Sequence, residues 1–148
     1  MDATFRLAGS ADLETLLPMV REFWVIERLH FVEPDVRRAL AGLLASPQYG
    51  LVILAESAGA PIGYLALTFG YSLEFLGRDA FVDEIYLRES YRGKGIGDRA
   101  IELAVERCRA LGVRALHLEV DHVNPRARAL YERVGFKPHE RALMTRLI

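Results

Sequence analysis

Six consecutive residues combine backbone flexibility with positive charge in a way that suits an anionic ligand. The segment reads RGKGIG and covers residues 92–97. Glycine lets the backbone adopt positive φ angles and lets a ligand approach the chain closely. Successive N–H groups at the start of a helix form a donor cradle, to which the helix dipole adds positive potential. A phosphate or pyrophosphate is the natural guest, and a plain strand-to-helix turn is the alternative.

The segment matches neither of two common phosphate-binding motifs. A Walker loop needs G-x-x-x-x-G-K-[ST], which is not present. The dinucleotide fingerprint G-x-G-x-x-G fails because Asp98 stands where the third glycine should follow Gly93 and Gly95. The turn therefore predicts an anion site without identifying the anion.

Two acids precede this turn in an apolar run that is typical of a buried strand. Asp83 and Glu84 lie within Phe81 to Leu87. A carboxylate in the middle of such a strand could act as a general base, directly or through water. Because side chains alternate along a strand, the two acids are expected on opposite faces of the sheet, so at most one of them faces a cleft.

The elements that must position these residues follow from apolar spacing and from turn residues. Helical spacing predicts helices over residues 13–29, 36–45, 96–111 and 125–134. Strands are predicted over 4–7, 51–55, 62–69, 81–87 and 115–120, with Phe136 and residues 143–147 as final strand material. Residues 71–79 are expected to form an irregular connection. The order β-α-α-β-β-β-α-β-α-β predicts one mixed α/β sheet with helices on both faces, in a single domain spanning residues 1–148.

Composition excludes several classes of function. The net charge is −1, with basic residues spread along the chain, which argues against a nucleic-acid partner. The single cysteine, Cys108, excludes an internal disulfide and is expected in the core. The histidines do not have the spacing of a metal site, so we expect no metal: His30, His117, His122 and His139. With neither a long apolar run nor a signal-peptide pattern, we expect a cytoplasmic protein without a membrane partner.

A second motif lies downstream of the glycine turn. It reads NPRARALYERVGF and covers residues 124–136. Together with the pattern R-x-x-G-x-G at Arg92, Gly95 and Gly97, it resembles the GNAT superfamily of acyl-CoA-dependent N-acetyltransferases. As in that family, the glycine pattern follows a strand, here ending with residues 85–87. The resemblance covers nearly the whole chain.

The resemblance implies a fold and a co-substrate. The expected fold is a central, mixed but mostly antiparallel sheet with a V-shaped splay between the fourth and fifth strands, into which acetyl-CoA inserts. The implied cofactor-binding residues are Ile85, Tyr86 and Leu87 for the pantetheine arm, Arg92, Gly93, Lys94, Gly95, Ile96 and Gly97 for the pyrophosphate, and Asn124 for the pantetheine. Asn124 also fits a helix N-cap. Arg126 and Arg128 are expected on a solvated helix face, with the 3′-phosphate of CoA as the alternative for one of them.

The resemblance also implies catalytic roles. Glu84, rather than Asp83, is expected to take up the proton of the amine, and main-chain N–H groups near Tyr86 or Leu87 would stabilise the oxyanion. Tyr131 is expected to protonate the departing thiolate, because a phenol with a pKa of about 10 stays protonated where a thiol of about 8.5 begins to ionise. The alternatives are a substrate-binding role for Glu84 and simple packing for Tyr131.

In the family that this chain resembles, the acceptor is recognised by the first two helices and by the loop before the fourth strand, here residues 24–35 and 71–79. These segments hold aromatic and acidic residues: Trp24, Phe31, Tyr71, Phe75, Glu27, Glu33, Glu74 and Asp79. Such a pocket favours a small-molecule cationic amine. A protein N-terminal or lysine acetyltransferase and a non-catalytic CoA-binding sensory module are the alternatives. The resemblance also implies a homodimer, since members of that family often dimerise through their C-terminal strands, and the apolar residues 143–148 would allow such a contact.

Overall fold

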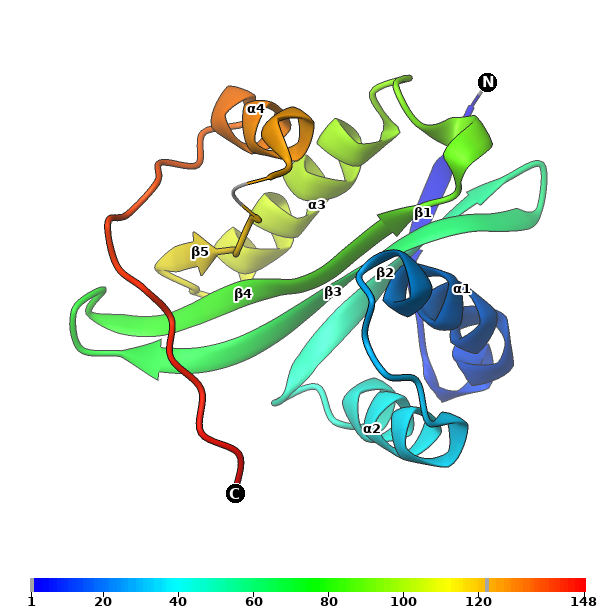
Figure 1. Ribbon diagram of the computed structural model, residues 1–148, viewed down its shortest axis with the longest axis horizontal. Coiled ribbons are helices and arrows are strands. Elements are labelled where there is room, and N and C mark those ends of the chain that lie inside the picture. Colours follow the sequence, from blue (N-terminus) through cyan, green and yellow to red (C-terminus); the bar gives the residue numbers. More distant parts are fainter. Residues whose placement is uncertain (1, 122) are drawn as a thin grey trace.

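The computed structural model describes residues 2–121 and 123–148, and it forms an open sheet with helices on both faces (Figure 1). The strands are β1 (Thr4–Leu7), β2 (Gly50–Ser57), β3 (Ala60–Ser72), β4 (Gly77–Leu87) and β5 (Ala115–His117). The helices are α1 (Leu13–Ile26), α2 (Glu33–Ala45), α3 (Ile96–Ala110) and α4 (Pro125–Arg133), with short 3-10 turns η1 (Ser10–Asp12) and η2 (Glu89–Tyr91). In the described residues no helix is both long and apolar enough to cross a bilayer.

The sheet opens between its fourth and fifth strands. The strand order is β1-β2-β3-β4-β5, antiparallel throughout except for the parallel pairing of β4 with β5. That last pairing joins only Asp79–Phe81 to Ala115–His117. Beyond it, residues 82–87 of β4 stay paired with β3 on one side, but no described strand pairs with them on the β5 side. The predicted mixed sheet and its splay are confirmed.

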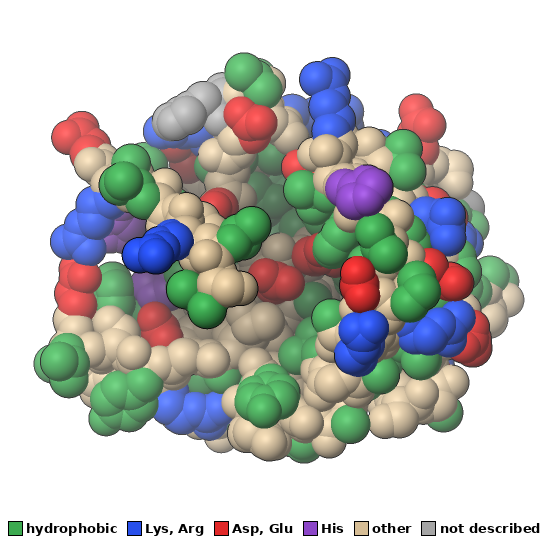
Figure 2. All heavy atoms as spheres, turned by 60° about the horizontal axis from the view of Figure 1, so that its bottom comes forward, with side chains coloured by type: hydrophobic (Ala, Val, Ile, Leu, Met, Phe, Trp, Pro, Cys, Tyr) green, Lys and Arg blue, Asp and Glu red, His purple; other side chains and the backbone are tan. Residues whose placement is uncertain are grey.

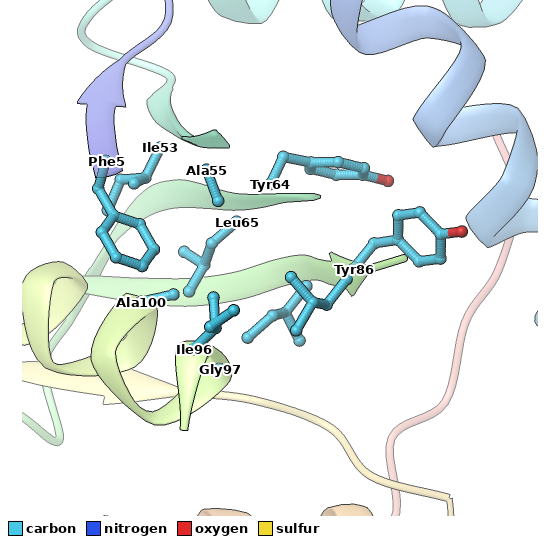
Figure 3. Close-up of a pocket in the computed structure, with 11 residues that line it drawn as sticks. Phe5, Ile53, Ala55, Tyr64, Leu65, Tyr86, Ile96, Gly97 and Ala100 are labelled. Carbon is cyan, nitrogen blue, oxygen red and sulfur yellow. The ribbon is translucent and has the colours of Figure 1, made fainter. Parts of the chain in front are cut away.

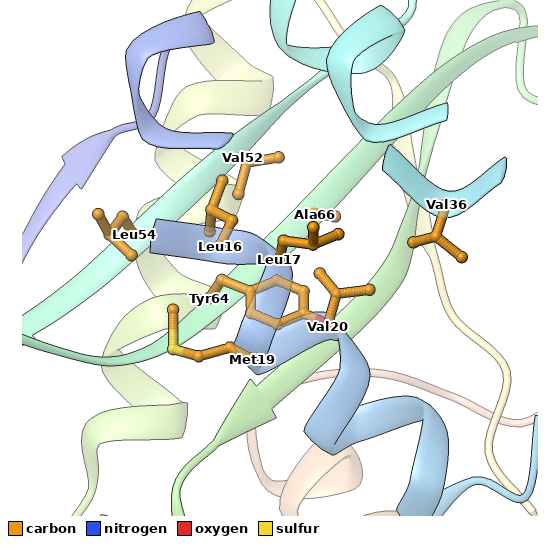
Figure 4. Packing of buried hydrophobic residues seen from close by; sticks show 9 residues of the cluster. All are labelled: Leu16, Leu17, Met19, Val20, Val36, Val52, Leu54, Tyr64 and Ala66. Atoms are coloured by element: carbon orange, nitrogen blue, oxygen red, sulfur yellow. The ribbon is translucent and has the colours of Figure 1, made fainter. Parts of the chain in front are cut away.

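Apolar clusters hold the layers together on both faces of the sheet. On the α1 face, Leu16, Met19 and Val20 of α1 pack against alternate residues of β2 and β3 (Figure 4). On the α3 face, Ile101, Ala104 and Cys108 pack against the intervening strand residues. The split follows strand alternation, since Tyr64 and Ala66 belong to the first cluster and Leu65 and Leu67 to the second. Cys108 is a buried core residue, as predicted.

The predicted irregular connection over residues 71–79 is mostly strand. The β3–β4 ladder continues to the pair Ser72 and Gly77, which leaves residues 73–76 as the turn. Main-chain pairing does not need apolar side chains, so the polar residues at the ends of both strands did not stop the hairpin.

The predicted final strand is also wrong. Among the described residues after α4, none forms a strand, and the apolar side chains Leu143, Met144 and Leu147 are exposed. An apolar composition cannot make a strand without a neighbouring edge to pair with, and β5 offers only Ala115–His117. The segment instead contacts the β3–β4 turn through an ion pair between Arg141 and Glu74 (Nη1 to Oε1, 2.8 Å).

Candidate active site

The glycine turn forms a backbone cradle at the start of α3. Gly93 and Gly95 have φ angles of 74° and 81°, which L side chains rarely adopt. Gly95 is the N-cap of α3, and no side chain caps the helix there. The first N–H groups of Ile96 and Gly97 therefore keep their hydrogen-bonding capacity, at the positive end of the helix dipole. The turn has the geometry of an anion site.

Basic side chains surround this cradle. The Arg92 Nε donates to the carbonyl of Leu87 (2.7 Å), and the Lys94 Nζ donates to the carbonyl of Ser90 (3.0 Å), so both brace the turn. Arg126, from the start of α4, brings its Nη2 within 3.4 Å of where a Cβ on Gly93 would lie. Arg126 is exposed, as predicted for a solvated helix face, and it also lies beside the glycine turn; the alternative contact with the 3′-phosphate of CoA stays a prediction.

The open edge of β4 runs directly into this cradle. Ile85 packs on the α3 face, while Tyr86 packs on the α1 face and its hydroxyl donates to Glu22 Oε2 (2.9 Å). A small apolar pocket lies between β3, the end of β4 and the first turn of α3, with Leu87 and Ile96 in its lining (Figure 3). An unpaired strand edge offers alternating N–H and C=O groups to an extended ligand. Residues 85–87 thus stand where such a ligand would continue into the cradle.

A β-bulge in β4 places Asp83 and Glu84 on the same side of the sheet. Val82 pairs with Leu67 and Glu84 with Ala66, so Asp83 is an extra residue. Val82 and Ile85 both pack on the α3 face, which leaves the two acids between them to face α1. The expectation of opposite faces is therefore wrong, because the bulge breaks the alternation on which it rested.

Glu84 is held by two neutral donors. The Trp24 Nε1 of α1 donates to its Oε2 (2.7 Å), and the Tyr64 hydroxyl of β3 donates to its Oε1 (2.8 Å). Burial raises the pKa of Glu84 above its ordinary value, and these two hydrogen bonds act against that rise. Loss of solvent likewise raises the pKa of Asp83, which is more exposed than Glu84. Figure 2 shows acidic side chains gathered in a hollow on this face.

Tyr131 and Asn124 come from α4, on the far side of the open edge. Tyr131 packs edge-on against Phe136, with ring centroids 6.1 Å apart. Burial raises the pKa of the Tyr131 hydroxyl, and the charge of Glu27 raises it further, so the phenol stays protonated at neutral pH. Asn124 Oδ1 accepts a hydrogen bond from the Ala127 N–H (3.1 Å), which confirms its capping role.

Glu27, which caps the C-terminus of α1, links the two predicted catalytic residues. Its negative charge raises the pKa of both Glu84 and Tyr131, so Glu27 lies within electrostatic range of both groups. The sequence placed Glu27 in an acceptor segment, but only the fold brings its charge within range of Glu84 and Tyr131.

Among the described histidines, His117 forms contacts of its own away from this group. His117 of β5 lies 3.2 Å from Asp79 (Nε2 to Oδ2) and between the rings of Phe75 and Phe81. Within residues 2–121 and 123–148, no cluster of histidine, cysteine and acidic side chains is arranged to hold a metal ion. His122 lies outside the described residues.

Comparison with known proteins identifies the family. The model of the acetyltransferase (GNAT) family matches residues 14–136. The chain belongs to the GNAT family. Thialysine N-epsilon-acetyltransferase of Bos taurus is 31% identical over 140 residues, a match covering 88% of this chain and 81% of that protein. The L-methionine sulfoximine/L-methionine sulfone acetyltransferase of Pseudomonas aeruginosa PAO1 is 28% identical over 142 residues, covering 93% of this chain and 81% of that protein.

Solved structures agree with this assignment. An integron cassette protein from the mobile metagenome of Cole Harbour salt marsh has a TM-score of 0.87 and 31% identity, covering 97% of this chain and 90% of that one. The GNAT chain described here is therefore an acetyltransferase, as its two motifs predicted. Members of the GNAT family use acetyl-CoA as co-substrate.

Proposed function

We propose that this GNAT enzyme transfers the acetyl group of acetyl-CoA to the primary amine of a small cationic molecule, by direct attack in a ternary complex. The observation that carries the proposal is the position of Asp83 and Glu84, two acids brought to one face by the bulge, beside Glu27. Burial already disfavours their charged forms, so a bound cation would recover electrostatic energy there.

The open edge of β4 and the turn that follows it fit acetyl-CoA. The uncapped start of α3, with Gly93 and Gly95 at positive φ, suits the pyrophosphate, and Arg126 adds charge beside it. The open edge at residues 85–87 suits the extended pantetheine arm, with Asn124 as a further partner. When bound, acetyl-CoA supplies the activated acetyl group.

Glu84 and Tyr131 would then handle the protons. Glu84 accepts a proton from the ammonium group, directly or through water, which frees the nitrogen lone pair for attack. Tyr131 donates its hydroxyl proton to the departing sulfur, since its raised pKa keeps that proton in place until it is needed. Main-chain N–H groups near Tyr86 or Leu87 would stabilise negative charge on the carbonyl oxygen.

The relatives support a small-molecule acceptor. One is named for acting on thialysine, and another for L-methionine sulfoximine and L-methionine sulfone. We infer that the acceptor of this chain is an amino-acid-like or polyamine-like amine, which the acids of the hollow would bind as a cation.

Thermal shift tests the cofactor first. Acetyl-CoA and CoA are expected to raise the melting temperature, whereas ATP at the same concentration is expected to raise it less. Equal shifts for all three compounds would contradict the proposal.

A panel of amines, read by release of free CoA thiol, tests the acceptor. Small diamines, amino acids and amino sugars are compared with peptides that carry a free N-terminus or a lysine. Turnover confined to the peptides would overturn the small-molecule assignment, and sedimentation of the same sample would test the predicted homodimer.

A further inference from the structure

Two neutral hydrogen-bond donors reach the Glu84 carboxylate from two different elements of the fold. Tyr64 comes from β3, next to Glu84 in the sheet, and its side chain is almost fully buried. Trp24 comes from the last turn of α1, sixty residues earlier in the chain. Each donor takes one carboxylate oxygen, at 2.7 Å from Trp24 and 2.8 Å from Tyr64. The carboxylate plane is therefore fixed, while each oxygen keeps a second lone pair for another donor.

Trp24 also contacts the segment that joins α1 to α2. Its ring meets the ring of Phe31 edge-on, with centroids 5.8 Å apart. The guanidinium of Arg21 covers Phe31 at 4.6 Å from the ring centroid. The carbonyl of Trp24 accepts the N–H of Leu29, which closes the end of the helix. One side chain thus touches both the α1–α2 segment and Glu84.

We propose that Trp24 and Tyr64 are positioning residues that aim the Glu84 carboxylate at the acceptor amine, and that Trp24 couples this aim to the α1–α2 segment through Phe31. The inference rests on the proposed function, in which Glu84 takes up the amine proton. It adds that an acceptor bound against the α1–α2 segment would also orient the Glu84 carboxylate, the base that deprotonates the acceptor.

The groups that face Glu84 determine whether its pKa should rise or fall in each variant. Tyr64 and Trp24 donate to the carboxylate and lower its pKa. Asp83 on β4 and Glu27 at the end of α1 raise the pKa by their negative charge, and burial raises it most. Loss of either donor should therefore move the acid limb of the rate profile to higher pH, because Glu84 must be ionised to act.

A spectroscopic titration reads the contact without turnover. Trp24 is the only tryptophan of the chain, so intrinsic tryptophan emission comes from the indole that donates to Glu84. Emission of the free enzyme is expected to change with pH, with a midpoint above the ordinary glutamate value of 4.5. The step should disappear in Glu84→Gln and move to higher pH in Tyr64→Phe. An unchanged step in Glu84→Gln would overturn the proposal.

Kinetics separate the positioning role from the function on which it rests. Trp24→Phe keeps an aromatic ring against Phe31 and removes the N–H donor, so we expect a fall in kcat of about tenfold with KM for acetyl-CoA unchanged. The same change in a Glu84→Gln background should cost little more, since both act through one group. An equal loss in both backgrounds would overturn the positioning role. If Glu84→Gln alone left kcat and its pH profile unchanged, the proposed function of Glu84 would fail instead.

Folding is checked separately by circular dichroism and thermal melting of each variant. Tyr64→Phe provides a second route if Trp24→Phe does not fold, because it removes the other donor and retains the tryptophan signal. An unshifted acid limb and an unshifted emission midpoint in folded Tyr64→Phe would contradict the inference.

Discussion

The proposed cofactor turn (residues 85–97) and the proposed acceptor face (Trp24, Tyr64, Asp83 and Glu84) meet at β4, yet they are built in different ways. The turn is local and made of backbone: its working groups lie within residues 85–97, and its side chains mostly brace the chain. The acceptor face is assembled from side chains of α1, β3 and β4, with Trp24 and Glu84 separated by sixty residues. The first should therefore be sensitive to backbone conformation, and the second to individual polar atoms.

The largest effect on turnover is expected from Tyr131→Phe, because this change removes the one hydroxyl proposed to protonate the leaving thiolate. Tyr131→Phe removes the hydroxyl whose pKa is raised by burial, and kcat should fall by about 10²-fold or more. The measurement is thiol release at saturating acetyl-CoA, where KM for acetyl-CoA should stay near its original value. Unchanged turnover on a good acceptor would remove Tyr131 from the mechanism.

The cofactor turn should respond to a change in backbone preference. Gly95→Val forces a β-branched residue toward φ 81°, although nothing lies within 4 Å of the added Cβ. KM for acetyl-CoA should rise by about tenfold, because a non-glycine residue in this region costs roughly 1–2 kcal/mol.

Gly59→Val is the matched control for this prediction. Gly59 has a φ angle of 78° and equally open surroundings, but it lies in the β2–β3 turn, away from the site. It should lower stability without changing KM for acetyl-CoA. If both variants raised KM alike, backbone conformation at the cradle would not be the cause.

Asp83→Asn tests the second acid of the acceptor face. Its charge raises the pKa of Glu84, so its removal should lower that pKa and extend activity to slightly lower pH. KM for a cationic acceptor should rise several-fold, and KM for acetyl-CoA should not. A pH–rate profile shifted the other way would show that the two acids do not share one face.

The smallest effect is expected from Arg126→Ala. Loss of the charge beside Gly93 should raise KM for acetyl-CoA by about threefold at low ionic strength and less at high salt, where screening weakens the interaction. Arg128→Ala is the comparison variant, because Arg128 instead pairs with Glu132 on the same helix (Nε to Oε1, 3.0 Å). Equal effects of the two changes would argue against a specific phosphate contact.

Much of the fold and of the cofactor turn could be predicted because their signals are local. Apolar spacing located the four helices and the strands of the sheet, and the two motifs identified the family. Residue pairing could not be predicted in the same way. The β-bulge at Asp83 depends on the register between β3 and β4, and the hairpin extends beyond its apolar residues for the same reason.

Other predictions failed or stayed predictions because they depend on contacts with distant parts of the chain or with other molecules. The final strand was inferred from apolar residues 143–147, but a strand also needs an edge to pair with, and β5 is short. The homodimer, the acceptor and the individual site residues stay predictions. The Trp24–Glu84 contact leaves no local pattern, because its residues are joined only by the packing of α1 on the sheet.

The sequence by itself determined which local conformations are available: glycines that allow the cradle, a proline and asparagine that begin α4, and alternating apolar residues that separate the two faces. The tertiary structure decided which side chains meet. It turned Asp83 and Glu84 to one face, placed Trp24 and Tyr64 on the Glu84 carboxylate and brought Arg126 to the cradle. The reason is physical: backbone preference acts between neighbours in sequence, whereas register, burial and charge act between neighbours in space.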